Sequence, residues 1–169
     1  DLYDKSSLLV GDQAGFMTGL RPLVKNERSF KVPIGPVSHV LSPGDQDWSI
    51  TEMISFWSRS AGGLQTSYTL VTTKSPTMHF YSGQSKGFSL NFTANITSIC
   101  TGYFDHSSAD GEMQIAVSCE NGEVYLVTNF EAKLFATIDL VLTKIAAFRR
   151  DVTGEDSNEA RRDIILGIG

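Results

Sequence analysis

The side chains that most suggest chemistry stand next to one another, in Asp105-His106-Ser107. These are the three residue types of a hydrolase triad, in which a histidine base lies between a nucleophilic hydroxyl and an orienting carboxylate. Consecutive residues in one polar loop rarely reach that arrangement, so a solvated turn is the better interpretation. Cys100 and His106 offer a thiol–imidazole pair instead. Cys100, however, ends an alternating apolar run, where a packing role is simpler.

The remaining polar residues form no recognised site. His39 and His79 are isolated in apolar, strand-like surroundings, and each is predicted to be a hydrogen-bonded strand residue rather than a ligand. Carboxylates that can bind a cation weakly occur in pairs at loop tips, without calcium-loop spacing: Asp45 with Asp47, and Asp110 with Glu112. The glycines at 11, 15 and 19 do not have phosphate-loop spacing. The sequence therefore predicts no enzyme, no cofactor and no metal site.

Composition describes an ordinary globular chain. It has 169 residues, of which 41% are hydrophobic and 20% are charged, and we expect one domain over residues 1–169. The formal charge of -5 excludes an overall basic surface for nucleic acid. No apolar run is long enough to cross a bilayer and no signal peptide starts at Asp1, so no membrane partner is expected. The absent initial Met is expected of a processed product or of the ordered part of something longer.

Cys100 and Cys119 fit no metal-ligand spacing. A disulfide between them requires an oxidising compartment. Buried free thiols are the favoured interpretation, because cysteine is among the most buried residue types.

One short helix is predicted near the middle of the chain. Ser49 and Glu52 have the spacing of a capping box. Apolar residues then recur at helical spacing, at Ile50, Met53, Ile54 and Trp57. Gly62-Gly63 supplies a stop, so the pattern predicts a helix over about residues 49–61.

The rest of the chain has strand character. Residues 64–73 are rich in Thr, Tyr, Val and Leu, and residues 88–97 alternate as one long strand with a wet face. An Asn-Gly turn at Asn121-Gly122 predicts a hairpin between residues 113–119 and 124–128. Shorter strands are predicted at 7–10, 30–34, 37–41, 77–81 and 164–168. Residues 134–148 fit both a strand and a helical period, and the strand is favoured because the neighbouring segments are strands.

About eight strands with one early helix are compatible with a two-sheet jelly roll or with part of a β-propeller. The lone helix favours the jelly roll, since propeller blades usually contain none. We therefore predict an all-β fold, an eight-stranded jelly-roll β-sandwich with one short inserted helix at about 49–61. Residues 1–25 are a candidate N-terminal extension.

Two segments resemble the large jelly-roll capsid protein of picorna-like viruses of invertebrates and algae (dicistroviruses, iflaviruses, marnaviruses). The first is VGDQAGFMTGLRPLVKNERSF, residues 10–30, where the resemblance is carried by Gly11, Asp12, Leu20, Arg21, Leu23 and Lys25. The second surrounds the predicted helix and is carried by Phe56, Trp57, Arg59, Gly62, Gly63, Leu64 and Tyr68. The resemblance covers about the first 75 residues. The Asp-Asp-Phe motif that some of these proteins use in maturation is absent, so that role is not carried over.

The resemblance implies a structural protein of a small icosahedral RNA virus, without catalysis or cofactor. Its implied partners are copies of itself, related capsid subunits, genomic RNA on the inner face and a host receptor. Its implied location is the virion, assembled in the host cytoplasm. The residues implied to serve architecture and subunit interfaces are Arg21, Trp57, Arg59, Gly62 and Gly63.

The alternative is a scaffold or interaction protein built as a β-propeller fragment. ITSICTGYFDHSSADGEMQIAVSCENGEVYLV, residues 96–127, is similar to propeller blades, in which an apolar strand, an Asp-rich turn and a hairpin recur. A propeller should repeat this pattern several times, and the sequence shows it clearly once.

Overall fold

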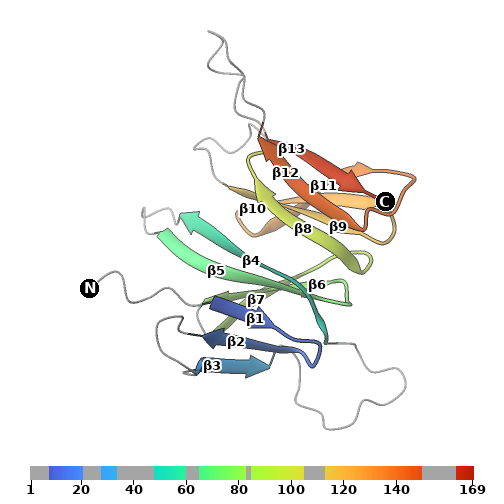
Figure 1. Ribbon diagram of the computed structural model, residues 1–169. Helices are drawn as coiled ribbons and strands as arrows, with labels where there is room; N and C mark the ends of the chain where they lie inside the picture. Colours follow the sequence, from blue (N-terminus) through green and yellow to red (C-terminus); the bar gives the residue numbers. More distant parts are fainter. Residues whose placement is uncertain are drawn as a thin grey trace.

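The computed structural model describes residues 8–20, 28–33, 48–59, 65–82, 85–104, 113–149 and 163–169. All regular secondary structure in these ranges is β, and the strands form four antiparallel sheets, which we name A to D in chain order (Figure 1). Within each sheet, strands that follow one another in the chain are neighbours.

Sheets A and D are the smaller ones. Sheet A contains β1 (Leu8–Gly11), β2 (Phe16–Leu20) and β3 (Arg28–Pro33). Sheet D is the hairpin of β12 (Lys144–Arg149) and β13 (Asp163–Ile168).

Sheets B and C have four strands each. Sheet B contains β4 (Ile50–Arg59), β5 (Gln65–Thr73), β6 (Thr77–Ser82) and β7 (Ser85–Asn91). Sheet C contains β8 (Ile96–Gly102), β9 (Gln114–Cys119), β10 (Glu123–Thr128) and β11 (Glu131–Thr137).

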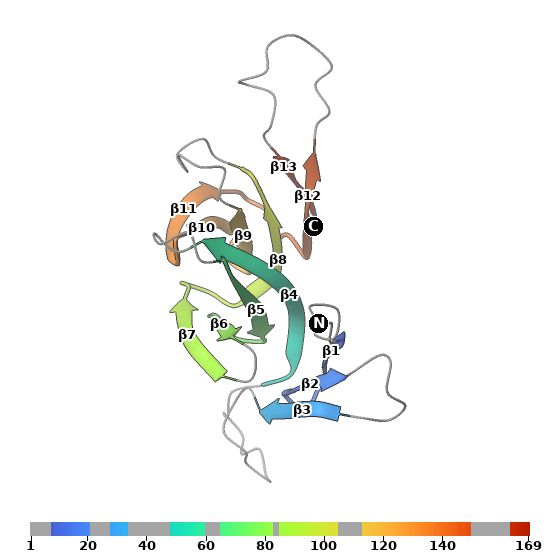
Figure 2. The ribbon, with the colours of Figure 1, turned by 90° about the vertical axis from the view of Figure 1, so that its left-hand side faces the viewer.

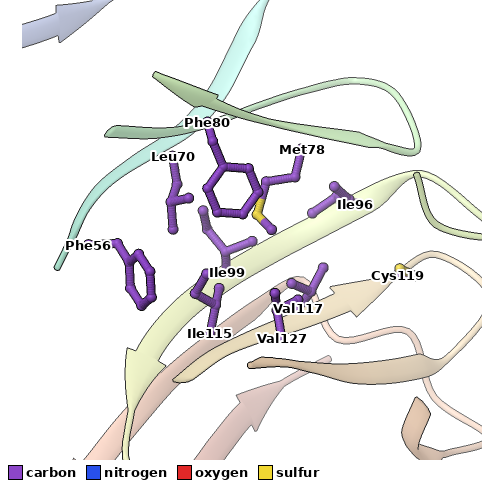
Figure 3. Packing of buried hydrophobic residues seen from close by; sticks show 10 residues of the cluster. All are labelled: Phe56, Leu70, Met78, Phe80, Ile96, Ile99, Ile115, Val117, Cys119 and Val127. Carbon is purple, nitrogen blue, oxygen red and sulfur yellow. The ribbon is translucent and has the colours of Figure 1, made fainter. Parts of the chain in front are cut away.

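The sheets pack face to face in the order A, B, C, D, with a separate apolar core in each of the three spaces. Successive residues of a strand point to opposite faces, so each strand of a middle sheet serves two cores. Leu70 packs between sheets B and C, whereas Val71 beside it packs between sheets A and B. The largest core lies between B and C, where Phe56, Leu70, Met78 and Phe80 face residues of sheet C (Figure 3).

The first strands of the sheets lie along one side of the stack. β1 contacts β4, β4 contacts β8, and β8 contacts β12. In Figure 2 the first strands β1 and β12 lie on the right, whereas the last strands β7 and β11 lie on the left. Sheets that share an axis at their first strands and extend outward are the arrangement of propeller blades.

The predicted jelly-roll sandwich is therefore wrong, because a sandwich has two sheets with one shared interior. Gln114 and Ser118 alternate with apolar residues along β9, yet every residue of β9 is buried. Gln114 is satisfied inside the protein, since its Oε1 accepts a hydrogen bond from Phe104 N at 2.9 Å and its Nε2 donates to Thr128 Oγ1 at 2.9 Å. Polar side chains that bond internally can line a second core instead of facing water.

The predicted helix over 49–61 is also wrong, because Ile50–Arg59 is the strand β4. The register shifts between Ile50 and Glu52, which leaves Thr51 as the extra residue of a β-bulge. The bulge lets Ile50 and Met53, three residues apart, pack on the same face toward sheet A. The bulge therefore places apolar residues three apart on one face of a strand, which is the spacing otherwise typical of a helix.

The two residues of the apparent capping box have tertiary partners. Ser49 Oγ donates a hydrogen bond to Gln13 O at 2.7 Å, and the Glu52 carboxylate accepts bonds from sheet C. Ile, Thr, Phe and Trp, which fill this segment, favour strands. Tertiary bonds and side-chain packing together outweigh the capping pattern.

The predicted long strand over 88–97 is two strands in different sheets. β7 ends at Asn91, β8 begins at Ile96, and the connection between them carries the chain from sheet B to sheet C. Backbone bonds hold this connection, from Phe92 N to Pro76 O at 2.8 Å and from Glu120 N to Asn95 O at 2.9 Å. Unbroken alternation conceals the crossover, because the apolar residues before and after it pack against the same core between sheets B and C.

Most other predicted strands are confirmed. The Asn-Gly hairpin pairs β9 with β10, and Gly122 has a φ of 79°, the left-handed conformation that its turn requires. Residues 134–148 include the end of β11 and most of β12, with a connection between them, so the strand interpretation was correct for those two parts. The predicted strand at 37–41 lies outside the described residues.

Candidate functional site

Most residues that suggested chemistry lie outside the described part of the chain. They are His39, Asp45, Asp47, Asp105, His106, Ser107, Asp110 and Glu112. Within the described ranges, no group of three or more His, Cys, Asp or Glu side chains is placed to hold a metal ion. No helix in those ranges is long and apolar enough to span a membrane.

The two cysteines are free thiols on opposite faces of sheet C. Cys119 packs in the core between sheets B and C, and Cys100 packs against the core between C and D. Burial raises the pKa of each thiol to about 11, so both are protonated at neutral pH. A protonated, packed thiol is a poor nucleophile, which agrees with the expected packing role of Cys100.

The residues implied to serve capsid architecture are only partly described. Trp57 and Arg59 lie on β4, while Arg21, Gly62 and Gly63 lie outside the described residues. Their interface role stays a prediction. Phe56, which belonged to the same resemblance, is buried in the core between sheets B and C.

One polar group joins the first strands of three sheets. Glu52 on β4 accepts a hydrogen bond from Ser98 Oγ at 2.9 Å and another from Ile99 N at 2.7 Å, both on β8. Ser98 Oγ in turn accepts a bond from Ile145 N on β12 at 3.2 Å. Lys144, also on β12, makes an ion pair with Glu52. Glu52 is thus a carboxylate whose oxygens tie sheet B to sheets C and D.

These linking residues occupy equivalent places in a repeat. The stretches ITEMI, ITSIC and LTKIA begin at Ile50, Ile96 and Leu142, which are 46 residues apart in turn (96 − 50 and 142 − 96). Glu52, Ser98 and Lys144 are the third residue of each stretch. A repeat of this length is close to the spacing of propeller blades. Sequence analysis missed it because the repeat is short and its third position varies chemically.

The local structure repeats as well. In both β4 and β8 the register shifts after the first residue of the stretch, so Thr51 and Thr97 are bulge residues. Thr51 Oγ1 hydrogen bonds with Thr72 Oγ1 at 2.9 Å, and Thr97 Oγ1 hydrogen bonds with Ser118 Oγ at 2.8 Å on the corresponding neighbouring strand. Thr51 in sheet B and Thr97 in sheet C therefore have the same role, since the hydroxyl of each bulge residue bonds to a hydroxyl on the neighbouring strand.

A second polar cluster lies at the surface, where the link between sheets B and C meets the β9–β10 hairpin. Glu123 accepts hydrogen bonds from Thr93, from Tyr125 Oη at 2.7 Å and from Asn121 Nδ2 at 2.7 Å. The bonds from Thr93, Tyr125 and Asn121 lower the pKa of this carboxyl. The cluster holds the inter-sheet link in place and brings no nucleophile together with a base.

His79 is the buried histidine that the sequence predicted as a hydrogen-bonded strand residue, and this is confirmed. It lies on β6 in the core between sheets A and B, and its Nδ1 hydrogen bonds with Ser89 Oγ at 2.8 Å. Its ring stacks on Trp48. Nε2 is buried without a protein hydrogen-bond partner. Burial, and then the charge of Lys86, lower the pKa of His79 to about 4.

Comparison with known proteins gives matches in structure alone. No protein-family profile matches the chain, and no curated protein matches it. It superposes on Saccharomyces cerevisiae Sqt1 with a TM-score of 0.69 at 12% identity, over 98% of this chain and 40% of Sqt1. It superposes on BBS1N, crystallised in complex with ARL6DN and soaked with mercury, with a TM-score of 0.63 at 10% identity, over 95% of this chain and 40% of BBS1N. The lead-soaked crystal of the same complex gives a TM-score of 0.58 at 12% identity, over 84% and 38%.

Both matched proteins are WD40 β-propellers, and the four-stranded antiparallel sheets of this chain resemble propeller blades. The chain spans about two fifths of the length of each. The capsid interpretation is therefore wrong, and so are the partners it implied, namely capsid subunits, genomic RNA and a host receptor. The virion location followed from that interpretation and stays untested. Short aromatic and glycine-rich segments suggested a capsid, but their described residues lie on or next to strands of sheets A and B, in a stack of sheets instead of a two-sheet sandwich.

Proposed function

We propose that this chain is part of a non-catalytic β-propeller scaffold that binds protein partners. The observation that carries the proposal is the stack of antiparallel sheets, in which sheets B and C have four strands each and pack on both sides; this stack superposes on Sqt1 and BBS1N. BBS1N was crystallised in complex with ARL6DN, so one protein with this fold binds a protein partner.

The chemistry of the described residues supports a role without catalysis. The thiols are protonated, and the carboxylate of Glu52 bonds to Ser98, Ile99 and Lys144 between sheets. A rigid stack presents many loops and strand edges on a fixed frame, which suits the recognition of other proteins.

The test is capture of partners followed by reconstitution. The tagged chain is expressed in the cells it comes from, crosslinked in place and purified, and each recovered candidate is then produced separately. Isothermal titration calorimetry of the purified pair should show saturable binding at micromolar or lower Kd.

The control is Gly122→Val, which disrupts the β9–β10 turn and so the fold. A partner that recognises the propeller should lose binding to this variant, whereas a chaperone should bind it more. If no purified candidate binds the native chain, the scaffold proposal is wrong.

A further inference from the structure

The bonds of Glu52 belong to a pattern that repeats between successive sheets. The backbone N of Ile99, the fourth residue of its stretch, donates to Glu52, the third residue of the preceding stretch. In the same way the backbone N of Ile145, the fourth residue of the next stretch, donates to Ser98 Oγ. The two bonds join residues with the same separation in the chain, 47 positions (99 − 52 and 145 − 98). The first strands of sheets C and D are therefore held on the preceding sheet through equivalent atoms.

The side chain of the fourth residue takes part in each of these contacts. Met53 packs against the core between sheets A and B, Ile99 lies in the core between B and C, and Ile145 lies in the core between C and D. The fourth residue thus anchors its strand on the preceding sheet by its side chain, and in sheets C and D also by its amide. Apolar packing holds the sheets together, and the amide bond adds direction.

Ser98 is the residue at which the two links meet. Its buried hydroxyl donates to Glu52 Oε1 at 2.9 Å and accepts from Ile145 N at 3.2 Å. The direction is fixed, because a carboxylate only accepts and a backbone N–H only donates. A hydroxyl that donates to a carboxylate is a better acceptor, since hydrogen bonds in a chain polarise one another. The bond at Ile145 in sheet D therefore depends on Glu52 in sheet B.

We propose that Ser98 couples sheet D to sheet B, so that the first strands β4, β8 and β12 open and close as one unit. The relay from Ile145 N through Ser98 Oγ to the Glu52 carboxylate carries the coupling, because without Glu52 the hydroxyl can rotate away from Ile145. Proteins open locally in such cooperative units. Lys144 offers a direct route through its ion pair with Glu52, but its side chain is 61% exposed, so water weakens that route. The coupling goes beyond the proposed scaffold role and does not depend on it.

Hydrogen exchange of the whole chain, measured at single amides by NMR, tests the coupling. The reporter is the Ile145 amide, and the reference is the Val127 amide on β10, an inner strand of sheet C that takes no part in the relay. E52A and S98A should each speed exchange at Ile145 about tenfold relative to Val127, the effect of losing one buried hydrogen bond. The double variant should also show an increase of about tenfold, because both changes break the same relay.

The matched control is K144Q, which removes the ion pair and keeps the relay, so Ile145 should exchange as in the wild type. The proposal is overturned if E52A leaves the Ile145 rate unchanged relative to Val127, or if K144Q has the effect of E52A. Independent effects that multiply to about a hundredfold in the double variant also overturn it.

If E52A does not fold, the wild-type chain decides. In urea below the unfolding transition, the Ile99 and Ile145 amides should show the same free energy of opening, and different values contradict the coupling. Partner binding in the calorimetric test is measured separately, so either idea can fail without the other.

Discussion

Two side chains between sheets have unusual environments or backbone conformations. His79 is only 2% exposed and keeps one ring nitrogen without a protein partner between sheets A and B. Phe130, in the β10–β11 turn, reaches across to aromatic rings of sheet B while its own φ is 64°. Each of these residues makes a contact between sheets that its local sequence does not require.

His79 should make stability depend on pH. Its folded-state pKa of about 4 lies below the ordinary value of 6.5, so the unfolded chain takes up the proton first. The free energy of unfolding should therefore hold above pH 6.5 and decrease as the pH falls from 6.5 to about 4. Urea titrations at several pH values should show wild type losing on the order of 2 kcal/mol more than H79N over that interval. Identical pH profiles would show that His79 is not protonated on unfolding.

Phe130 should stabilise the protein at a cost in backbone strain. Its ring lies 4.7 Å from Phe88 and 5.4 Å from Tyr68, centroid to centroid, so F130A should lose about 2–3 kcal/mol. Glycine tolerates positive φ better than alanine, and F130G should be about 1 kcal/mol more stable than F130A. Chemical denaturation measures both values. An F130G variant less stable than F130A would mean that the turn does not hold this conformation.

Single elements depend on tight turns and on bulges placed at the same point in each sheet. The β9–β10 hairpin turns at Gly122, whose carbonyl accepts a hydrogen bond from Ile138 N at 3.0 Å. The bulges at Thr51 and Thr97 open β4 and β8 and let the third residue of each stretch reach the next sheet. The bulges therefore orient the side chains that connect neighbouring sheets.

Gly122→Ala should damage its hairpin severely. An added Cβ would lie 2.1 Å from Ile138 O, at a φ that side chains avoid, and the contact is with backbone that has little room to move. We expect a loss of at least about 2 kcal/mol in the free energy of unfolding. The matched control is Gly87→Ala, where the nearest atom is 3.3 Å away and the position is exposed on β7. This control should change stability by less than about 1 kcal/mol; equal losses at the two sites would contradict the explanation.

At the scale of the whole molecule, stability depends on contacts between sheets. Three apolar cores fill the spaces between the sheets, and the bonds of Glu52 connect the first strands of sheets B, C and D. Sheets packed by apolar contact alone can slide, whereas directional hydrogen bonds fix their register.

Glu52→Gln should loosen the link between sheets B and C. The variant weakens the bonds from Ser98 Oγ and Ile99 N, and a loss of about 1–3 kcal/mol is expected. K144Q should lose less than about 1 kcal/mol, because Lys144 is 61% exposed and its ion pair is weakened by solvent. Hydrogen exchange at the Ile99 amide should speed up in E52Q and not in K144Q. An unchanged Ile99 rate in E52Q would refute the linking role.

Local pattern alone determined much about this protein: the all-β class, most strand positions, the Asn-Gly hairpin and the free, packed cysteines. Each depends on residues close together in the chain, on alternation, turn chemistry or side-chain polarity. Tertiary structure decided the rest. Whether Gln114 and Ser118 face water or a second core, and whether Ile50–Arg59 is helix or strand, depends on which sheets lie on either side. The 46-residue repeat (96 − 50) is present in the sequence, but its short stretches were recognised only from the structure, where Glu52 bonds to Ser98 and Ser98 bonds to Ile145.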